Sequence, residues 1–209
     1  MHPAPAFRDD DAALERVVNI GFAQIVIVTP EGLMMVHAPM TRHAATLRFH
    51  VARHNRAAPY LDGASALLSA SAVDGYLSPN WYAVPGDQVP TWNYVAIEVE
   101  GRLHALDEDE LIAQLDDLAA FHEPRVNPGA PWTRGKMNDI RFRAMLQGIR
   151  GYELRPAAIR GTTKLSQNKS FSDRQGVVAG LRAAGNFSLA TAMEDIMPDA
   201  TGSTSAQPR

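Results

Sequence analysis

The sequence predicts a β-barrel decorated by helices, in a single domain over residues 1–198 followed by a flexible tail over 199–209. Three observations support this class. Short β-branched or alternating segments follow one another at close spacing in the first half of the chain. Helical segments are grouped between and after these strands, without the regular alternation of a parallel βαβ fold. No stretch has the composition of a clear domain linker.

The strands are predicted from two patterns. Residues 23–29 are rich in β-branched side chains, and the turn Pro30-Glu31-Gly32 joins them to the next apolar segment, which predicts a hairpin. Residues 46–51 and 93–101 alternate apolar and polar side chains, as expected for strands with one buried face. In the last strand, Pro156 predicts an edge or a bulge. The predicted strands are residues 23–29, 33–38, 46–51, 64–71, 93–101 and 149–159.

The helices are predicted from capping signals and apolar stripes. The first begins after the acidic residues 9–11, which offer an N-cap, and ends at Gly21. The second opens with Asp107 and Glu110 at the spacing of a capping box, and its stripe is leucine-rich. A Pro- and Gly-rich loop over 124–131 follows it. The predicted helices are residues 11–20, 107–121, 138–147, 173–183 and 188–197.

Composition excludes several function classes. The chain has no cysteine, which rules out disulfides, iron–sulfur clusters, thiolate zinc sites and a cysteine nucleophile. No apolar run approaches ~18 residues, and the N-terminus lacks the pattern of a signal peptide, so we expect no membrane association and a cytoplasmic location. The seven histidines are scattered, so we expect no metal site. The sequence also lacks a P-loop, a dinucleotide fingerprint and a nucleophile elbow.

The net charge of −3 hides a strong asymmetry along the chain. Residues 98–123 carry nine acidic side chains against Arg102 alone, whereas residues 134–182 carry eleven basic side chains against three acidic ones. Two solvated faces that complement each other, within the fold or across a dimer, would explain this pattern. An anion site in the basic segment is the alternative.

Four polar and aromatic stretches carry candidate chemistry. In the first, FHVARHN, His50 and Arg53 offer donors where a strand opens into a loop, a usual place for a phosphate site. YLSPNWY and VPTWNY bring large rings onto irregular backbone, where aromatics either fill a corner of the core or stack on a planar ligand. KLSQNK holds two of the three lysines among hydrogen-bonding side chains, although a loop cap would look similar.

The four stretches together match the needs of flavin mononucleotide (FMN). Its phosphate requires cations and hydroxyls, its ribityl chain polar partners, and its ring aromatic or apolar faces. A nucleobase or another flat anion would satisfy the same requirements, so the residue types alone do not choose between them.

The order of these motifs, behind the opening MHPAPAFR, resembles the PaiB-like family of FMN-binding negative transcriptional regulators. The resemblance extends from residue 1 to about residue 181 and departs from the family pattern at Leu77 and His54. It implies an FMN-binding split β-barrel, similar to pyridoxamine 5′-phosphate oxidases, that forms a homodimer with two flavin sites at the interface. By this resemblance His50, Arg53 and Asn55 lie near the phosphate and ribityl chain. The ring and the dimer seam would be lined by Ser78, Trp81, Tyr82, Thr91, Trp92 and Asn93, and the site closed by Lys164, Ser166, Gln167 and Asn168.

Three functions follow as hypotheses. A flavin-dependent oxidoreductase would use NAD(P)H or a small-molecule substrate, with the cofactor supplying the chemistry. A transcriptional regulator is what the family name implies, but the chain shows no helix-turn-helix, zinc finger or basic arm, and its pI is near 6.1. A flavin-binding sensor without turnover is the third. No catalytic acid, base or nucleophile stands out; His50 is the best titratable candidate.

Overall fold

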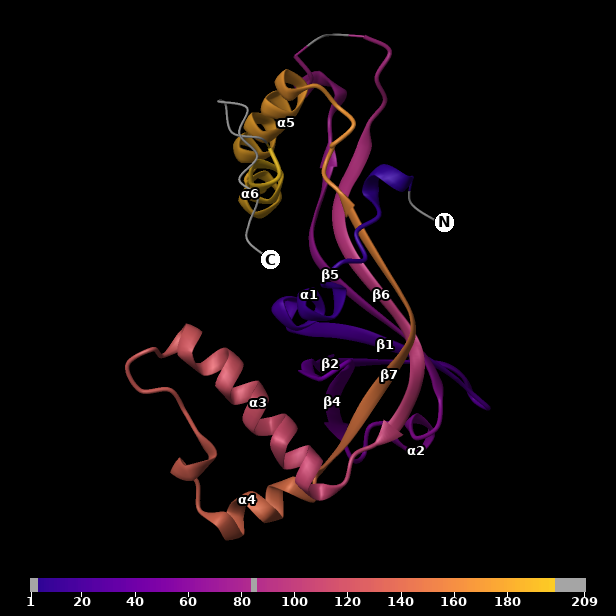
Figure 1. Cartoon of the computed structure of the whole chain (residues 1–209), viewed down its shortest axis with the longest axis vertical. Coiled ribbons are helices and arrows are strands. Elements are labelled where there is room, and N and C mark those ends of the chain that lie inside the picture. The colour runs from indigo at the N-terminus through magenta and orange to yellow at the C-terminus, as the bar shows by residue number, and fades with distance from the viewer. Residues whose placement is uncertain (1–3, 84–85, 198–209) are drawn as a thin grey trace. The chain divides into compact units, whose positions relative to one another are not determined.

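The structure, a computed structural model, describes residues 4–83 and 86–197 (Figure 1). Its seven strands form one sheet in the order β2-β1-β5-β6-β7-β4-β3. The registers of β1 with β2 and β5, and of β4 with β3 and β7, are antiparallel. The strands are β1 (Phe22–Thr29), β2 (Gly32–Pro39), β3 (Thr41–His43), β4 (Thr46–Ala52), β5 (Ser65–Leu77), β6 (Thr91–Ala105) and β7 (Ile149–Lys164).

Helices lie before, between and after the strands. Within the described ranges, none of them combines the length and the apolar character that a membrane crossing requires. The α-helices are α1 (Ala13–Ile20), α2 (Ala58–Leu61), α3 (Glu108–Val126), α4 (Asp139–Leu146), α5 (Phe171–Ala183) and α6 (Phe187–Asp195). The short 3₁₀ turns are η1 (Pro5–Phe7), η2 (Pro79–Trp81) and η3 (Arg134–Lys136).

The chain divides into two compact units, each with its own core. Unit 1 comprises Met1–Asp9, Ser71–Ala96 and Thr162–Arg209, and unit 2 comprises Asp10–Ala70 and Ile97–Gly161. Strands β5, β6 and β7 contribute residues to both units, so the boundary falls within strands and not at a linker. The single domain expected from the sequence stays a prediction, and the expected tail over 199–209 lies outside the described residues.

Unit 2 holds most of the sheet around a single apolar core. Alternate residues of β1 and β2, such as Ile25, Ile27 and Val36, point into this core, and their register confirms the predicted hairpin. The predicted capping box is also present: the Asp107 carboxylate accepts from the Glu110 backbone N–H at 2.8 Å, and the Glu110 side chain accepts from the Asp107 N–H at 3.1 Å. This capping box fixes the start of α3, whose N-cap Asp107 lies two residues after the end of β6.

Unit 1 is built from α5 and α6, which pack on the C-terminal half of β5 and the N-terminal part of β6. Its core is a separate cluster that includes Leu77, Val95, Val177, Leu181 and Leu189. A Cβ atom at Gly176 would lie 2.1 Å from the Trp81 carbonyl oxygen, so α5 and η2 approach each other as closely as two backbones can.

Several predicted boundaries are wrong. Strands β5 and β7 run past their predicted ends into unit 1, and β6 extends beyond its predicted residues at both ends. Helix α3 continues through Pro124, where a loop was expected. The N-cap of α1 is Ala12, without a side-chain cap, because Asp10 instead accepts a hydrogen bond from the Gly161 backbone N–H at 2.6 Å.

Pro156 was expected at an edge or a bulge, but β7 lies between β6 and β4. The register of β4 with β7 ends at Leu154, two residues before the proline. Pro156 lacks a backbone N–H, but it lies beyond the residues of β7 that pair with β4, so no hydrogen bond between these two strands is lost.

Candidate functional site

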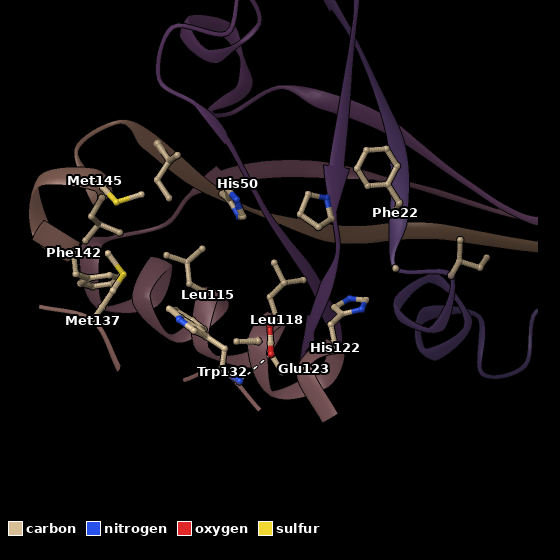
Figure 2. A pocket seen from close by; sticks show the side chains of 16 residues that line it. Phe22, His50, Leu115, Leu118, His122, Glu123, Trp132, Met137, Phe142 and Met145 are labelled. Carbon is tan, nitrogen blue, oxygen red and sulfur yellow. Dashed lines mark hydrogen bonds between the residues drawn. The ribbon is translucent and has the colours of Figure 1, made fainter. Parts of the chain in front are cut away.

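A cavity of about 800 Å³ lies in unit 2 (Figure 2). One wall comes from the start of β1, the end of β2 and β4. The opposite wall is an arm made of α3, the connection after it and α4. The lining residues are Ile20, Gly21, Phe22, Pro39, His50, Leu115, Leu118, Ala119, His122, Glu123, Trp132, Met137, Phe142, Met145, Leu146 and Ile149.

The walls of this cavity are mostly apolar and include no lysine or arginine. Three of the lining residues have ionisable side chains. The Glu123 carboxylate accepts from the Trp132 backbone N–H at 2.8 Å, which holds the α3–α4 connection against α3 (Figure 2). His50 and His122 are the other two, and Figure 2 shows both rings at the cavity. Such a cavity suits a flat, largely apolar group.

His50 is held in place by a buried amide of α3. Its Nδ1 lies 2.9 Å from Oε1 of Gln114, so in this arrangement Nδ1 carries the proton and Nε2 is an acceptor. Burial lowers the pKa of His50, although its hydrogen bond to Gln114 acts in the opposite direction. The Gln114 side chain is fully buried, and its Nε2 has no hydrogen-bond partner among the described residues. Such an orphaned donor is uncommon and points to a group that the chain alone does not supply.

The other two residues of the first motif shape the loop after β4. The Asn55 side chain accepts from the Ala57 backbone N–H at 2.9 Å, and Arg53 Nε donates to the Gln147 carbonyl at 2.6 Å. Arg53 also lines a second, polar hollow of about 490 Å³, together with Arg150. This hollow shares Leu146 and Ile149 with the apolar cavity, so cations lie next to the cavity but not in its walls.

The second motif forms a corner of the core of unit 1. Ser78 Oγ accepts from the Asn80 backbone N–H at 3.2 Å and caps η2. The Trp81 indole lies against α5, where a Cβ at Gly180 would come within 2.3 Å of the ring. Tyr82 is buried in the same core. These contacts correspond to the packing role that the sequence left open as the alternative to stacking on a ligand.

The third and fourth motifs are brought together. Asn93 is fully buried, and its Nδ2 donates to Ser166 Oγ at 2.9 Å, while Lys164 Nζ donates to Thr91 Oγ1 at 2.6 Å. Gln167 folds back onto its own loop: it accepts from the Leu165 N–H at 2.8 Å and donates to the Thr163 carbonyl. Asn168 is exposed.

Trp92 and Tyr76 are exposed rings of these motifs, each 50% exposed. The Trp92 Nε1 donates to Asp74 at 3.0 Å, and its ring meets Tyr76 edge-on.

These placements separate the predicted site residues into two groups. His50, Arg53 and Asn55 belong to unit 2, and the other ten belong to unit 1.

Comparison with known proteins identifies the family. Residues 1–157 match a family model described as "Putative FMN-binding domain". The match covers well over half of the chain and includes the first three motifs. The chain belongs to this FMN-binding family. Its cofactor, FMN, is the one predicted from the four motifs, whereas the fourth motif lies beyond the matched residues.

Curated relatives resemble this chain over more than half of its length. The "Protease synthase and sporulation protein PAI 2" of Bacillus subtilis is 31% identical over 133 residues, which are 64% of this chain and 62% of that protein. The match thus spans less than two thirds of that relative. It confirms the PaiB-like resemblance.

Solved structures with the same fold bind flavins according to their names. A FAD and heme binding protein from Mycobacterium smegmatis has a TM-score of 0.54 at 17% identity, over 83% of this chain and 80% of its own. The flavocytochrome Anf3 of Azotobacter vinelandii has a TM-score of 0.53 at 12% identity, over 78% and 72%. At these identities the likeness concerns the fold alone. It confirms the predicted split β-barrel class.

The residues of unit 2 fit the cofactor of the family. The cavity volume lies within the roughly 300–1,000 Å³ of small-molecule sites, its walls are apolar, and Gln114 Nε2 is a buried donor without a partner. The phosphate does not fit among these walls because they carry no cation. The neighbouring hollow, with Arg53 and Arg150, supplies the positive charge that it requires.

The sequence did not identify Gln114 or the arm as part of this site. A signal was present: Gln114 lies three and four residues from Leu111 and Leu118 and interrupts the apolar stripe of α3. A polar residue in such a stripe needs a buried partner, which is His50.

Proposed function

We propose that this chain is an FMN-binding protein whose flavin ring occupies the apolar cavity of unit 2, beside His50 and Gln114. The observation that carries the proposal is a cavity of suitable size in a member of an FMN-binding family, with His50 in its wall and the buried amide of Gln114 holding that ring. His50, held by Gln114, would meet the polar edge of the ring, and the apolar walls would cover its faces. Arg53 would meet the phosphate, with Asn55 shaping the loop that holds it.

FMN supplies hydride or electron transfer when it is bound. The residues of this chain would orient the ring, exclude water with the apolar walls and hold a proton at His50 Nδ1. Because burial lowers the pKa of His50, its ring is neutral at pH 7, and Nε2 can accept a hydrogen bond. A neutral acceptor at the cavity favours an oxidoreductase that uses NAD(P)H or a small-molecule substrate as the second candidate.

Titration of the full chain with FMN, followed by flavin fluorescence and the visible spectrum, tests the cavity. The variant Gln114→Met keeps a similar volume but removes the hydrogen bond that holds the His50 ring, and we expect it to weaken FMN binding about tenfold. The exposed Gln175 of α5 gives the matched control, Gln175→Met, which should bind FMN like the parent chain. A protein that gains no flavin from excess FMN would refute the proposal.

A homodimer is the second part of the proposal. Its support is an apolar outer face of the sheet in unit 2, where Val28 pairs with Leu33, and Val26 pairs with both Met35 and Leu67. Val28 and Leu33 are more than two thirds exposed, which is unusual for adjacent aliphatic side chains on a strand pair. A second copy would cover this face. Light scattering of the parent chain and of Leu33→Asp tests it: we expect a dimer and a monomer, respectively.

In such a dimer both chains would line each flavin. The residues of unit 1 that the family resemblance assigns to the ring and the seam, or to the closing of the site, would then come from the partner. They are Ser78, Trp81, Tyr82, Thr91, Trp92, Asn93, Lys164, Ser166, Gln167 and Asn168. Among these residues, Trp92 is exposed and could contact the flavin of the partner directly. Asn93 and Tyr82 are buried, so they would affect flavin binding only through the packing of unit 1.

Regulation of transcription rests on the family resemblance. Direct DNA binding has less support, because Arg134, Arg143 and Arg160 pair with acidic residues of the 98–123 segment. A mobility-shift assay at physiological salt, with and without FMN, tests it. If the assay shows no sequence-dependent shift, any role in transcription would have to be indirect.

A further inference from the structure

Arg174, in the first turn of α5, is a buried cation without a counter-ion. The residue is 7% exposed, and its Nε and Nη2 atoms are buried with no hydrogen-bond partner in the part of the chain that the structure describes. It lies on the core-facing side of α5, in line with Val177, Val178 and Leu181. Burial lowers its pKa, and no neighbouring charge offsets this effect. A guanidinium in this state lacks the anion that normally accompanies it.

The basic residues around Arg174 also lack carboxylate partners. In residues 162–182, only Arg182 forms a salt bridge with an acidic side chain of the described chain, Glu194. Lys164 donates to Thr91, and Lys169 donates to Gln88 at 2.7 Å and lies 4.9 Å from the Tyr82 ring centroid. Within the described residues, these partners of Lys164 and Lys169 are therefore neutral side chains and not carboxylates.

The position of Arg174 adds further donors. Its backbone N–H donates to the Ser170 carbonyl at 3.0 Å, which places the residue one turn from the helix N-terminus. The Ser170 and Ser172 hydroxyls lie 3.1 Å apart in the same turn. The N-terminal end of a helix favours an anion. Asp173 is the acidic residue of this turn, and its carboxylate accepts from the Ala83 backbone N–H at 3.0 Å.

We propose that unit 1 carries a binding site for the phosphate group of a small molecule, with Arg174 as its recognition residue and Lys169 and the hydroxyls of the first turn of α5 as supporting donors. A guanidinium, an ammonium and hydroxyls are together the donor set of a phosphate site, whereas a single carboxylate would engage Arg174 alone. Two sources offer this chemistry: the 5′-phosphate of FMN held by a partner protomer, and a separate phosphorylated ligand.

The first arm of the test uses inorganic phosphate as the probe. Calorimetric titration of the full chain in a phosphate-free buffer should show saturable binding. The variant Arg174→Gln should weaken it at least tenfold, and Arg182→Gln, on the same helix, should leave it within twofold. Absence of phosphate binding by the parent chain, or equal binding by Arg174→Gln, would overturn the proposal. If Arg174→Gln does not fold, Arg174→Lys keeps the charge without the planar fork and should still lose affinity.

The second arm identifies the source. Parent and Arg174→Gln chains are titrated with FMN and with riboflavin, which lacks the phosphate. Weaker binding of FMN with unchanged riboflavin binding assigns the site to the flavin phosphate. Unchanged affinity of Arg174→Gln for both flavins, with inorganic phosphate still bound by the FMN-loaded parent chain but not by FMN-loaded Arg174→Gln, assigns it to a separate ligand. A change in the light-scattering mass of Arg174→Gln without loss of phosphate binding would identify Arg174 as a dimer contact and refute the phosphate site.

Discussion

Gly176→Ala in α5 tests how firmly the second motif is held. The added Cβ would lie 2.1 Å from the carbonyl oxygen of Trp81, whereas Cβ atoms in real proteins keep at least 3.0 Å from such a neighbour. The neighbour is backbone, so no side-chain rotation can relieve the contact, and either α5 or η2 must move.

The magnitude follows from two opposing effects. Overpacking against rigid neighbours costs ~1–3 kcal/mol, and a backbone contact belongs at the upper end of this range. Alanine regains about 1 kcal/mol of helix propensity over glycine. We therefore expect a net loss of about 2 kcal/mol in the free energy of unfolding.

Urea unfolding followed by far-UV circular dichroism measures this loss. The control is Gly129→Ala, because a Cβ there meets no atom within 4 Å, and its free energy of unfolding should change by less than ~0.5 kcal/mol. A Gly176→Ala chain as stable as the parent would show that α5 does not rest on η2. The reasoning that makes Trp81 a packing residue would then fail, and a stacking role for its ring would regain support.

Three further predictions concern buried polar groups. Asn93→Ala should lower the free energy of unfolding by ~1–3 kcal/mol because it removes the hydrogen bond to Ser166. The control is Asn168→Ala, at an exposed position, which should change it little. The urea midpoints of the two variants measure the difference. Burial would raise the pKa of Glu153, but hydrogen bonds from Arg155, Arg48 and Thr46 outweigh it and lower the pKa below 4.5. This stabilisation is complete above pH ~4.5 and is lost as the pH falls through the lowered pKa, so Glu153→Gln should flatten the acid limb of the stability profile. Burial lowers the pKa of His50, so the unfolded chain takes up the proton first, and stability should fall as the pH drops below ~6.5; a His50→Gln chain whose urea midpoint follows the same pH dependence would contradict this.

Local signals predicted local structure well. The Pro30-Glu31-Gly32 turn predicted the hairpin, and the spacing of Asp107 and Glu110 predicted the capping box that starts α3. These features depend on residues a few positions apart, and their hydrogen bonds form within that distance. The end of α3 was predicted less well, because Pro124 does not end the helix.

The candidate site was predicted only in part. The motif order indicated the family and its cofactor, which the family match confirms. It did not predict that the first motif lies in one unit and the other three in a second, because the boundary runs through the middle of three strands. It also missed Gln114 and Arg174, whose significance depends on what they do or do not contact.

The sequence by itself determined the strand-rich class, the family and its cofactor, because these depend on periodicity and on contiguous motifs. Only the tertiary structure decided which side chains remain available to a ligand. Asn93, Tyr82 and Trp81 are largely engaged in packing and hydrogen bonds within unit 1, while the cavity of unit 2 is closed by an arm more than sixty residues from His50 in sequence. Burial and hydrogen-bond satisfaction arise from contacts between distant segments, and no local pattern encodes them.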